Sequence, residues 1–244
     1  MIDVNLVDIV LVETSHPGNI GATARAMKTM GFSRLVLVNP KFFPDERADA
    51  RATTHAVDIL ESARIVPTLS DAIADAHCVI GTSAQSRHLP WPMVGPRELG
   101  PKVCGMVGAG QKVALVFGRE RGGLYNEELQ MCHFHVEIPT SPECRALNLA
   151  SAVQVLCYEV MMAAALHAGE KAPHTPAPMA DFDRLMDHLY ETLVAIKFMD
   201  PDHPRLLKER LRRLFLRAAP DDTEVSILRG IFRAVKDGLV GANK

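Results

Sequence analysis

The sequence lacks any C-x-x-C pair, and its five cysteines show no metal-ligand spacing. An odd number of unpaired cysteines is typical of free thiols in a reducing compartment, so we expect a cytoplasmic protein without a disulfide framework. The chain also lacks a surplus of positive charge, because 27 Lys and Arg stand against 29 Asp and Glu. Any contact with nucleic acid must therefore come from a local patch.

A convincing membrane span is also missing. The one stretch of sufficient length, "LNLASAVQVLCYEVMMAAALHA" from Leu147 to Ala168, contains Asn148, Gln154 and Glu159. Because these side chains are costly in lipid, we expect no membrane segment but a long helix in a protein core or a dimer interface. The first residues hold two Asp and an Asn and no basic cluster, so we expect no secretory signal.

Several common catalytic motifs are absent as well. The sequence has no G-x-G-x-x-G, no Walker A motif, no H-E-x-x-H and no G-x-S-x-G. His133 and His135, beside Cys132, raise the question of zinc, since alternate residues of a strand point to one face. No second ligand pair has suitable spacing, so we expect structural histidines and no metal site.

Short apolar runs alternate with helical patterns over residues 1–168. The runs are continuous in Val, Ile and Leu, which is typical of strands covered on both faces. We therefore predict an α/β domain with a parallel sheet. The expected strands are 7–12, 35–38, 78–82, 113–118 and 134–138, with a weaker one at 64–66, and the expected helices between them are 21–30, 71–76 and 126–131.

The helical pattern ends after this domain, where three prolines lie within six residues. We therefore predict a linker over residues 169–180. Helical patterns return at 181–198, 204–218 and 222–238, which predicts a small all-α module over 181–244. From Arg205 to Arg217 there are six basic residues and one acidic residue, whereas the rest of this module is acidic overall. Two interpretations stay open, a solvated helix face or an RNA-binding module.

The first strand runs into the unusual loop "ETSHPGNIGATARAMKTMG", from Glu13 to Gly31. Gly18 and Gly21 permit close backbone approach, and backbone amides before a helix favour an anion, here an RNA phosphate. Arg25 lies one to two turns into the helix, where its guanidinium could hold a phosphate through two hydrogen bonds. A helix-capping turn with a surface arginine explains the same residues, so this loop alone does not distinguish a binding site from an ordinary turn.

Three further polar loops follow strands. Arg119, Glu120 and Arg121 lie between glycines directly after the strand at 113–118, where ligands bind in open α/β sheets. The loop "GTSAQSRHLPWPM" offers small side chains for a pocket, although its Trp91 is more typical of a structural plug than of a base-stacking platform. The loop "IPTSPECRALNLASAVQ" could wrap a flat adenine or serve as an ordinary connection.

In this order, "SHPGNIGATARAMKTMG", "ALVFGRERGGL" and "LNLA" resemble the three motifs of the SPOUT superfamily of RNA methyltransferases. Together with "LVNP" and "GTSAQSRHLPWPM", they resemble the members that methylate ribose 2′-hydroxyls of tRNA, and the likeness extends into the basic tail. The resemblance implies a parallel α/β domain whose C-terminal part forms a trefoil knot, a rare exception among folds. It also implies a homodimer with each active site at the subunit interface.

The resemblance further implies that S-adenosylmethionine is the cofactor and that cytidine or uridine 32 of the tRNA anticodon loop is the target. Arg25 matches the residue usually called catalytic. Because a guanidinium is a poor free base, we expect it to position the ribose–phosphate and to stabilise the developing alkoxide. The expected supporting or substrate residues are Asn19, Arg119, Glu120 and Asn148. The expected cofactor-binding residues are Thr82, Ser83, Ala84, Gly118, Ile138, Ala146, Leu147 and Leu149.

One position departs from the pattern, because relatives often carry serine where this chain has Ala146. A contact made by that hydroxyl is absent here or is made otherwise. Three alternatives stay open. The first is a relative acting on rRNA or on another tRNA position, and the second is a non-catalytic RNA-binding protein of the same fold. The third is a nucleotide-dependent oxidoreductase, which the missing G-x-G-x-x-G disfavours.

Overall fold

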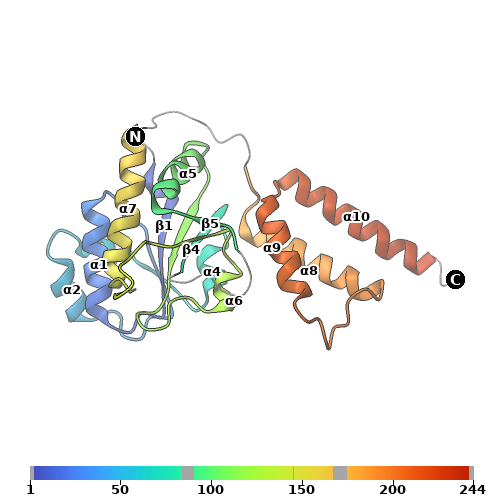
Figure 1. Cartoon of the computed structure of the whole chain (residues 1–244), viewed down its shortest axis with the longest axis horizontal. Helices are drawn as coiled ribbons and strands as arrows, with labels where there is room; N and C mark the ends of the chain where they lie inside the picture. Colours follow the sequence, from blue (N-terminus) through green and yellow to red (C-terminus); the bar gives the residue numbers. More distant parts are fainter. Residues whose placement is uncertain (1–2, 84–90, 145, 167–174, 242–244) are drawn as a thin grey trace. The chain divides into compact units, whose positions relative to one another are not determined.

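The computed structural model describes residues 3–83, 91–144, 146–166 and 175–241 (Figure 1). The chain divides into two compact units, Met1–Pro173 and His174–Lys244, and the division lies within the stretch predicted to be a linker. The first unit combines a sheet with helices, and in residues 175–241 of the second unit the regular elements are all helices. The predicted combination of an α/β domain and an all-α module is confirmed.

The first unit is built on a seven-stranded sheet in the order β3-β2-β1-β6-β4-β7-β5, and every neighbouring pair is parallel. The central strands β1 and β6 are buried along their whole length, which is why they appear in the sequence as continuous apolar runs. The strands are β1 Val7–Val12, β2 Leu35–Val38, β3 Arg64–Val66, β4 Cys78–Thr82, β5 Met93–Val94, β6 Val113–Phe117 and β7 Phe134–Val136.

Helices surround this sheet, and the longest of them, α7, packs against both α1 and α5 (Figure 1). One side of α7 belongs to the core, where Val153, Leu156 and Val160 are fully buried. Among the described residues no helix is long and apolar enough to cross a membrane. The helical elements are η1 Val4–Leu6, α1 Pro17–Thr29, α2 Glu46–Ala52, α3 Val57–Glu61, α4 Leu69–Ile73, α5 Pro96–Gly108, α6 Asn126–Leu129 and α7 Leu149–Leu166.

The apolar patterns of the sequence did not predict α5, α2, α3 or the short β5. Two prolines and three glycines hide the helical pattern of α5. The helix begins where Pro96 fixes the backbone and the Glu98 carboxylate accepts a hydrogen bond from the Gly95 N–H at 3.1 Å. A Cβ at Gly100 would lie only 2.5 Å from the carbonyl oxygen of Glu159 on α7. Close packing between two helices therefore outweighs low helix propensity here.

The second unit contains α8 Met179–Ala195, α9 Leu207–Ala218 and α10 Asp222–Gly241, which agree with the three predicted helices. Helix α8 packs along α10, and two ion pairs join α8 to its neighbours. Arg212 of α9 donates to Asp183 at 2.7 Å, and Lys236 of α10 donates to Glu191 at 2.9 Å. The packing of α8 against both other helices makes this unit compact.

Candidate active site

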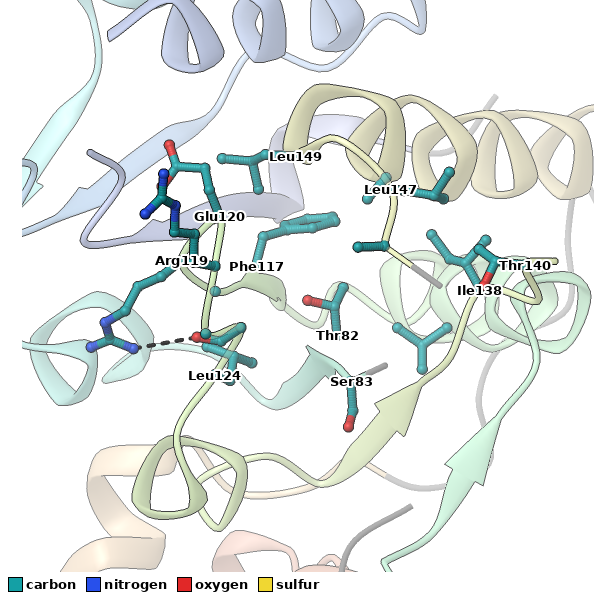
Figure 2. A pocket seen from close by; sticks show the side chains of 17 residues that line it. Thr82, Ser83, Phe117, Arg119, Glu120, Leu124, Ile138, Thr140, Leu147 and Leu149 are labelled. Atoms are coloured by element: carbon teal, nitrogen blue, oxygen red, sulfur yellow. Dashed lines mark hydrogen bonds between the residues drawn. The ribbon is translucent and has the colours of Figure 1, made fainter. Parts of the chain in front are cut away.

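A pocket of about 280 Å³ opens beyond the carboxyl ends of β4, β6 and β7 (Figure 2). Its walls come from four segments: the end of β4, residues 117–124 after β6, residues 136–140 after β7, and residues 146–152 at the start of α7. The carboxyl ends of parallel strands meet at one edge of a sheet, so loops far apart in the sequence converge there. A mostly apolar hollow with a few polar groups is typical of a small-molecule site.

The residues predicted to bind a cofactor come together around this pocket. Ala84 lies outside the described residues. The structure also adds Phe117 and Leu124 to the wall. The sequence does not mark either residue as part of a site, because both resemble ordinary core residues. The predicted residues that line the pocket are Thr82, Ser83, Gly118, Ile138, Ala146, Leu147 and Leu149.

Glu120, at the rim of the pocket, holds the loop that precedes α1. One carboxylate oxygen accepts hydrogen bonds from the N–H and the hydroxyl of Ser15, at 3.2 and 3.1 Å. The other accepts from the His16 N–H and from Asn19 Nδ2, both at 3.1 Å. Amides before a helix attract an anion, and in this chain the anion is its own carboxylate. The prediction that these amides bind an RNA phosphate is therefore wrong for Ser15 and His16.

Asn148 extends the same network to the beginning of α7. Its Nδ2 donates to Asn19 Oδ1 at 3.0 Å, and its Oδ1 accepts from the Ala150 N–H at 2.9 Å, which caps the helix. A continuous row of hydrogen bonds thus runs from Glu120 through Asn19 to Asn148. Three of the four predicted supporting residues form this row, and together they fix α1, α7 and the loop after β6 relative to one another.

Ionised Glu120 is favoured by these contacts. Burial by itself raises the pKa of Glu120, but hydrogen bonds from Asn19, Ser15 and His16 stabilise the carboxylate and bring its pKa below the ordinary 4.5. Substitution Glu120→Gln replaces one carboxylate oxygen by an amide NH₂, which then faces two of the four donors. We expect it to lower the free energy of unfolding by about 1–2 kcal/mol at neutral pH.

The effect of Glu120→Gln depends on pH in a defined direction. A carboxyl group whose pKa is depressed by folding stabilises the protein above its unfolded-state pKa, and this contribution disappears as the pH falls through the folded-state pKa. The difference in Tm between wild type and variant should therefore shrink below about pH 4.5 in thermal unfolding followed by circular dichroism. Glu137→Gln, at an exposed side chain, is the control. A constant difference at every pH would contradict the role of the carboxylate.

Arg119, the fourth predicted supporting residue, forms contacts within the chain. Its Nε donates to Glu13 and its two terminal nitrogens donate to Glu128, all at 2.9 Å. Its guanidinium also lies 3.8 Å from the ring centroid of Tyr125. The hydrogen bond from Arg119 lowers the pKa of Glu13. Because these partners come from the end of β1 and from the start of α6, Arg119 fixes the pocket loop rather than offering its charge to a ligand.

Arg25 is placed differently from the other predicted residues. Its side chain is exposed on α1, and it is not among the residues that line the pocket. It follows Asn19 by six residues, which is about 9 Å along the helix axis. Within the described part of the chain no side chain or carbonyl bonds to its guanidinium, which leaves the group available to a ligand or to another subunit.

Trp91 and the two histidines serve the interior of the first unit. The Trp91 Nε1–H donates to the Cys132 carbonyl at 2.8 Å, and its ring stacks on His135 with the centroids 5.4 Å apart. His133 Nδ1 accepts the Val79 N–H at 3.1 Å. Trp91 is therefore a structural plug, as its sequence context favours. In the described ranges no cluster of three or more His, Cys, Asp or Glu side chains could hold a metal ion.

The basic residues around α9 do not all face solvent. Arg212, besides its ion pair with Asp183, lies with its guanidinium 5.3 Å from the ring centroid of Phe182, so it contributes to packing. Arg205, Arg210 and Arg217 are exposed. The exposed group gives this part of the second unit a positively charged surface.

Comparison with known proteins agrees with this arrangement of motifs. The family model described as the SpoU rRNA Methylase family matches residues 7–158, and the model described as the tRNA methyltransferase TrmJ, C-terminal domain, matches residues 180–244. The tRNA (cytidine/uridine-2′-O-)-methyltransferase TrmJ of Escherichia coli (strain K12) is 53% identical over 233 residues, which cover 93% of this chain and 94% of that protein.

Two solved structures extend the similarity to three dimensions. TrmJ from Z. mobilis ZM4 has a TM-score of 0.82 and 29% identity, covering 94% of this chain and 98% of that chain. A probable methylase family protein from Haemophilus influenzae Rd KW20 has a TM-score of 0.65 and 39% identity, covering 99% and 100%. The similarity in both comparisons spans nearly the whole chain, including the helical C-terminal unit.

Proposed function

Because the chain belongs to the SpoU rRNA methylase family, we propose that it methylates the ribose 2′-oxygen of cytidine or uridine 32 in the anticodon loop of tRNA, with S-adenosylmethionine as methyl donor. Its 53% identity to a tRNA (cytidine/uridine-2′-O-)-methyltransferase over 93% of the chain supports this substrate class. The observation that carries the proposal is that the second and third motif-bearing segments line one pocket. Asn19 of the first segment is joined to them through Glu120 and Asn148 in a single hydrogen-bonded row.

The pocket fits the proposed cofactor. Phe117, Ile138 and Leu147 offer apolar surfaces for a flat adenine ring, and Ser83 adds a hydroxyl group at the rim. Leu147 lines the pocket and is 42% exposed. An apolar group of a bound cofactor would cover this exposed surface. When bound, S-adenosylmethionine supplies an electrophilic sulfonium methyl group. These residues would hold and orient it while excluding water from the adenine.

Arg25 is the catalytic residue of this proposal. Transfer to a ribose oxygen requires the 2′-hydroxyl to approach in line with the methyl group, so positioning provides much of the rate. A guanidinium stays charged at neutral pH and cannot act as a free base. Arg25 therefore binds the ribose–phosphate and stabilises the negative charge that develops on the 2′-oxygen as its proton passes to solvent water.

We infer that the enzyme is a homodimer whose subunits complete each other's active sites. Arg25 does not line the pocket of its own chain, so a second subunit brings it to the substrate. Helix α7 also exposes an apolar stripe at helical spacing. Tyr158, Met161 and Met162 on this stripe are 45%, 36% and 39% exposed. A continuous apolar stripe of this kind is typical of a subunit interface.

The second unit is the proposed RNA-binding module. The exposed Arg205, Arg210 and Arg217 supply a local positive surface in a chain whose net charge is −2. Contacts of this type neutralise backbone phosphates without reading sequence, which suits a tRNA body far from the methylated nucleotide. The trefoil knot of the first unit and a cytoplasmic location complete the proposal.

The test is transfer of labelled methyl from S-adenosylmethionine to bulk tRNA that lacks modifications, followed by mapping of the labelled nucleotide. We expect label on the 2′-oxygen of cytidine or uridine 32. Label on another tRNA position, or on rRNA alone, would replace the proposed substrate. Cofactor binding in a calorimeter without transfer to any RNA would show an RNA-binding protein that does not catalyse.

A further inference from the structure

Three consecutive charged residues, Arg119, Glu120 and Arg121, line the pocket after β6, and two of them are fully engaged within the chain. Arg119 is bound by two carboxylates and Glu120 by four donors. Arg121 differs from both. Its side chain is exposed, and among the residues that the structure describes none is bonded to it. A free guanidinium therefore stands at the rim of the pocket.

The backbone under Arg121 is held firmly. The Arg119 N–H donates to the Gly123 carbonyl at 3.1 Å, and the Gly123 N–H donates to the Arg119 carbonyl at 3.0 Å. This pair of bonds closes a three-residue loop with Arg121 at its centre, and Gly123 takes the positive φ of +61° that such a loop requires. Since the loop is already ordered, little backbone entropy is lost when its central side chain binds a ligand.

We propose that Arg121 binds a backbone phosphate of the RNA substrate at the rim of the pocket, next to the ribose that is methylated. The inference rests on the proposed function and names a substrate contact that is separate from Arg25. A guanidinium matches a phosphate through two parallel hydrogen bonds. Because the Arg121 side chain is exposed at the rim, it is better placed to contact a macromolecule that covers the rim than a cofactor enclosed by the apolar wall. The carboxylate of the cofactor is the other anion within this chemistry, and the test separates the two.

The experiment compares Arg121→Gln, Arg121→Lys and the control Arg97→Gln, which removes the same charge from an exposed site on α5 outside the pocket lining. Affinity for unmodified tRNA is measured by filter binding over a series of salt concentrations, and cofactor affinity is measured by calorimetry. Arg121→Gln should weaken tRNA binding about tenfold and reduce the slope of log K against log salt by about 1. The Kd of Arg121→Gln for S-adenosylmethionine should stay within about twofold of the wild-type value, since the substitution removes a contact with RNA and none with the cofactor.

The other variants sharpen the result. Arg121→Lys keeps the charge but not the planar pair of donors, so the salt slope should return to the wild-type value while affinity recovers only in part. Arg97→Gln should match wild type in every measurement. Unchanged tRNA affinity and salt slope in Arg121→Gln would overturn the proposal. A loss confined to cofactor affinity would also overturn it and would assign the guanidinium to the carboxylate of the cofactor.

This test is independent of the proposed reaction. Filter binding and calorimetry require no turnover, so the phosphate contact is measured even in a protein that transfers no methyl group. If the wild type leaves tRNA unmethylated but Arg121→Gln binds tRNA more weakly than the wild type, the phosphate contact is supported and the proposed reaction is rejected. If the wild type methylates nucleotide 32 but Arg121→Gln binds tRNA as tightly as the wild type, the reaction is supported and the phosphate contact is rejected.

Discussion

Replacing Arg25 with alanine is expected to lower kcat about 100- to 1,000-fold, the usual cost of removing one preorganised donor to a developing oxyanion. The Kd for S-adenosylmethionine should stay near the wild-type value, because Arg25 does not line the pocket. Single-turnover methyl transfer to tRNA and calorimetry with the cofactor measure the two quantities. Arg97→Ala, at another exposed arginine of the first unit, is the control. An unchanged kcat would reject the catalytic role of Arg25.

Mixing Arg25→Ala with a second variant, Leu147→Arg, tests whether Arg25 acts in the pocket of its own subunit or in that of its partner. Leu147→Arg puts a charged side chain into the pocket and should prevent cofactor binding without disturbing the core, since Leu147 is 42% exposed. If Arg25 serves the pocket of the partner, a mixed dimer of the two variants contains one intact site. Random exchange of subunits should then restore about a quarter of wild-type activity in a symmetric dimer. No recovery would place Arg25 at the pocket of its own chain.

Substitution Gly118→Ala is expected to weaken cofactor binding more than about 100-fold and to lower the free energy of unfolding by about 3 kcal/mol or more. A Cβ at this position would lie 2.0 Å from the carbonyl carbon of Gly123 and 2.2 Å from the nitrogen of Leu124. Both are backbone atoms, so no side-chain rotation relieves the clash. The loop from 119 to 123 would have to move away from the pocket that it lines.

The same substitution at Gly105, on α5, provides the matched control. Nothing lies within 4 Å of a Cβ there, so Gly105→Ala removes only backbone freedom from a helix. We expect it to raise the free energy of unfolding by up to about 1 kcal/mol and to leave cofactor binding unchanged. Calorimetry and thermal unfolding of both variants make the comparison. Normal cofactor binding by Gly118→Ala would contradict the close approach of the two loop segments.

The apolar runs of the sequence predicted the sheet well. The runs at 7–12 and 113–118 became β1 and β6, because a strand buried on both faces needs apolar side chains at every position. The sequence pattern did not predict helix α5. Gly100 lowers local helix propensity, and only its contact with Glu159 of α7, 59 residues further along the chain, explains why a glycine stands there.

The candidate site shows the same division. The small polar side chains directly after a strand pointed to Thr82, and the resemblance to a known family added Gly118 and Leu147 to the expected pocket, which all three line. Their spacing did not show that Glu120 occupies the amides before α1, or that Arg119 is held by Glu13 and so leaves its charge unavailable. Those roles depend on partners more than 100 positions away in the sequence.

By itself the sequence determined the class of fold, the order of six of its seven strands along the chain, the loops that carry the chemistry and the family to which the chain belongs. These properties follow from local hydrophobic patterns and short motifs. Only the tertiary structure decided which charge in "GRERGG" remains free, namely that of Arg121, and that Arg25 stands apart from the pocket. The reason is physical: whether a charged side chain supports the fold or meets a ligand depends on the neighbours that folding brings to it, and those neighbours come from distant segments of the chain.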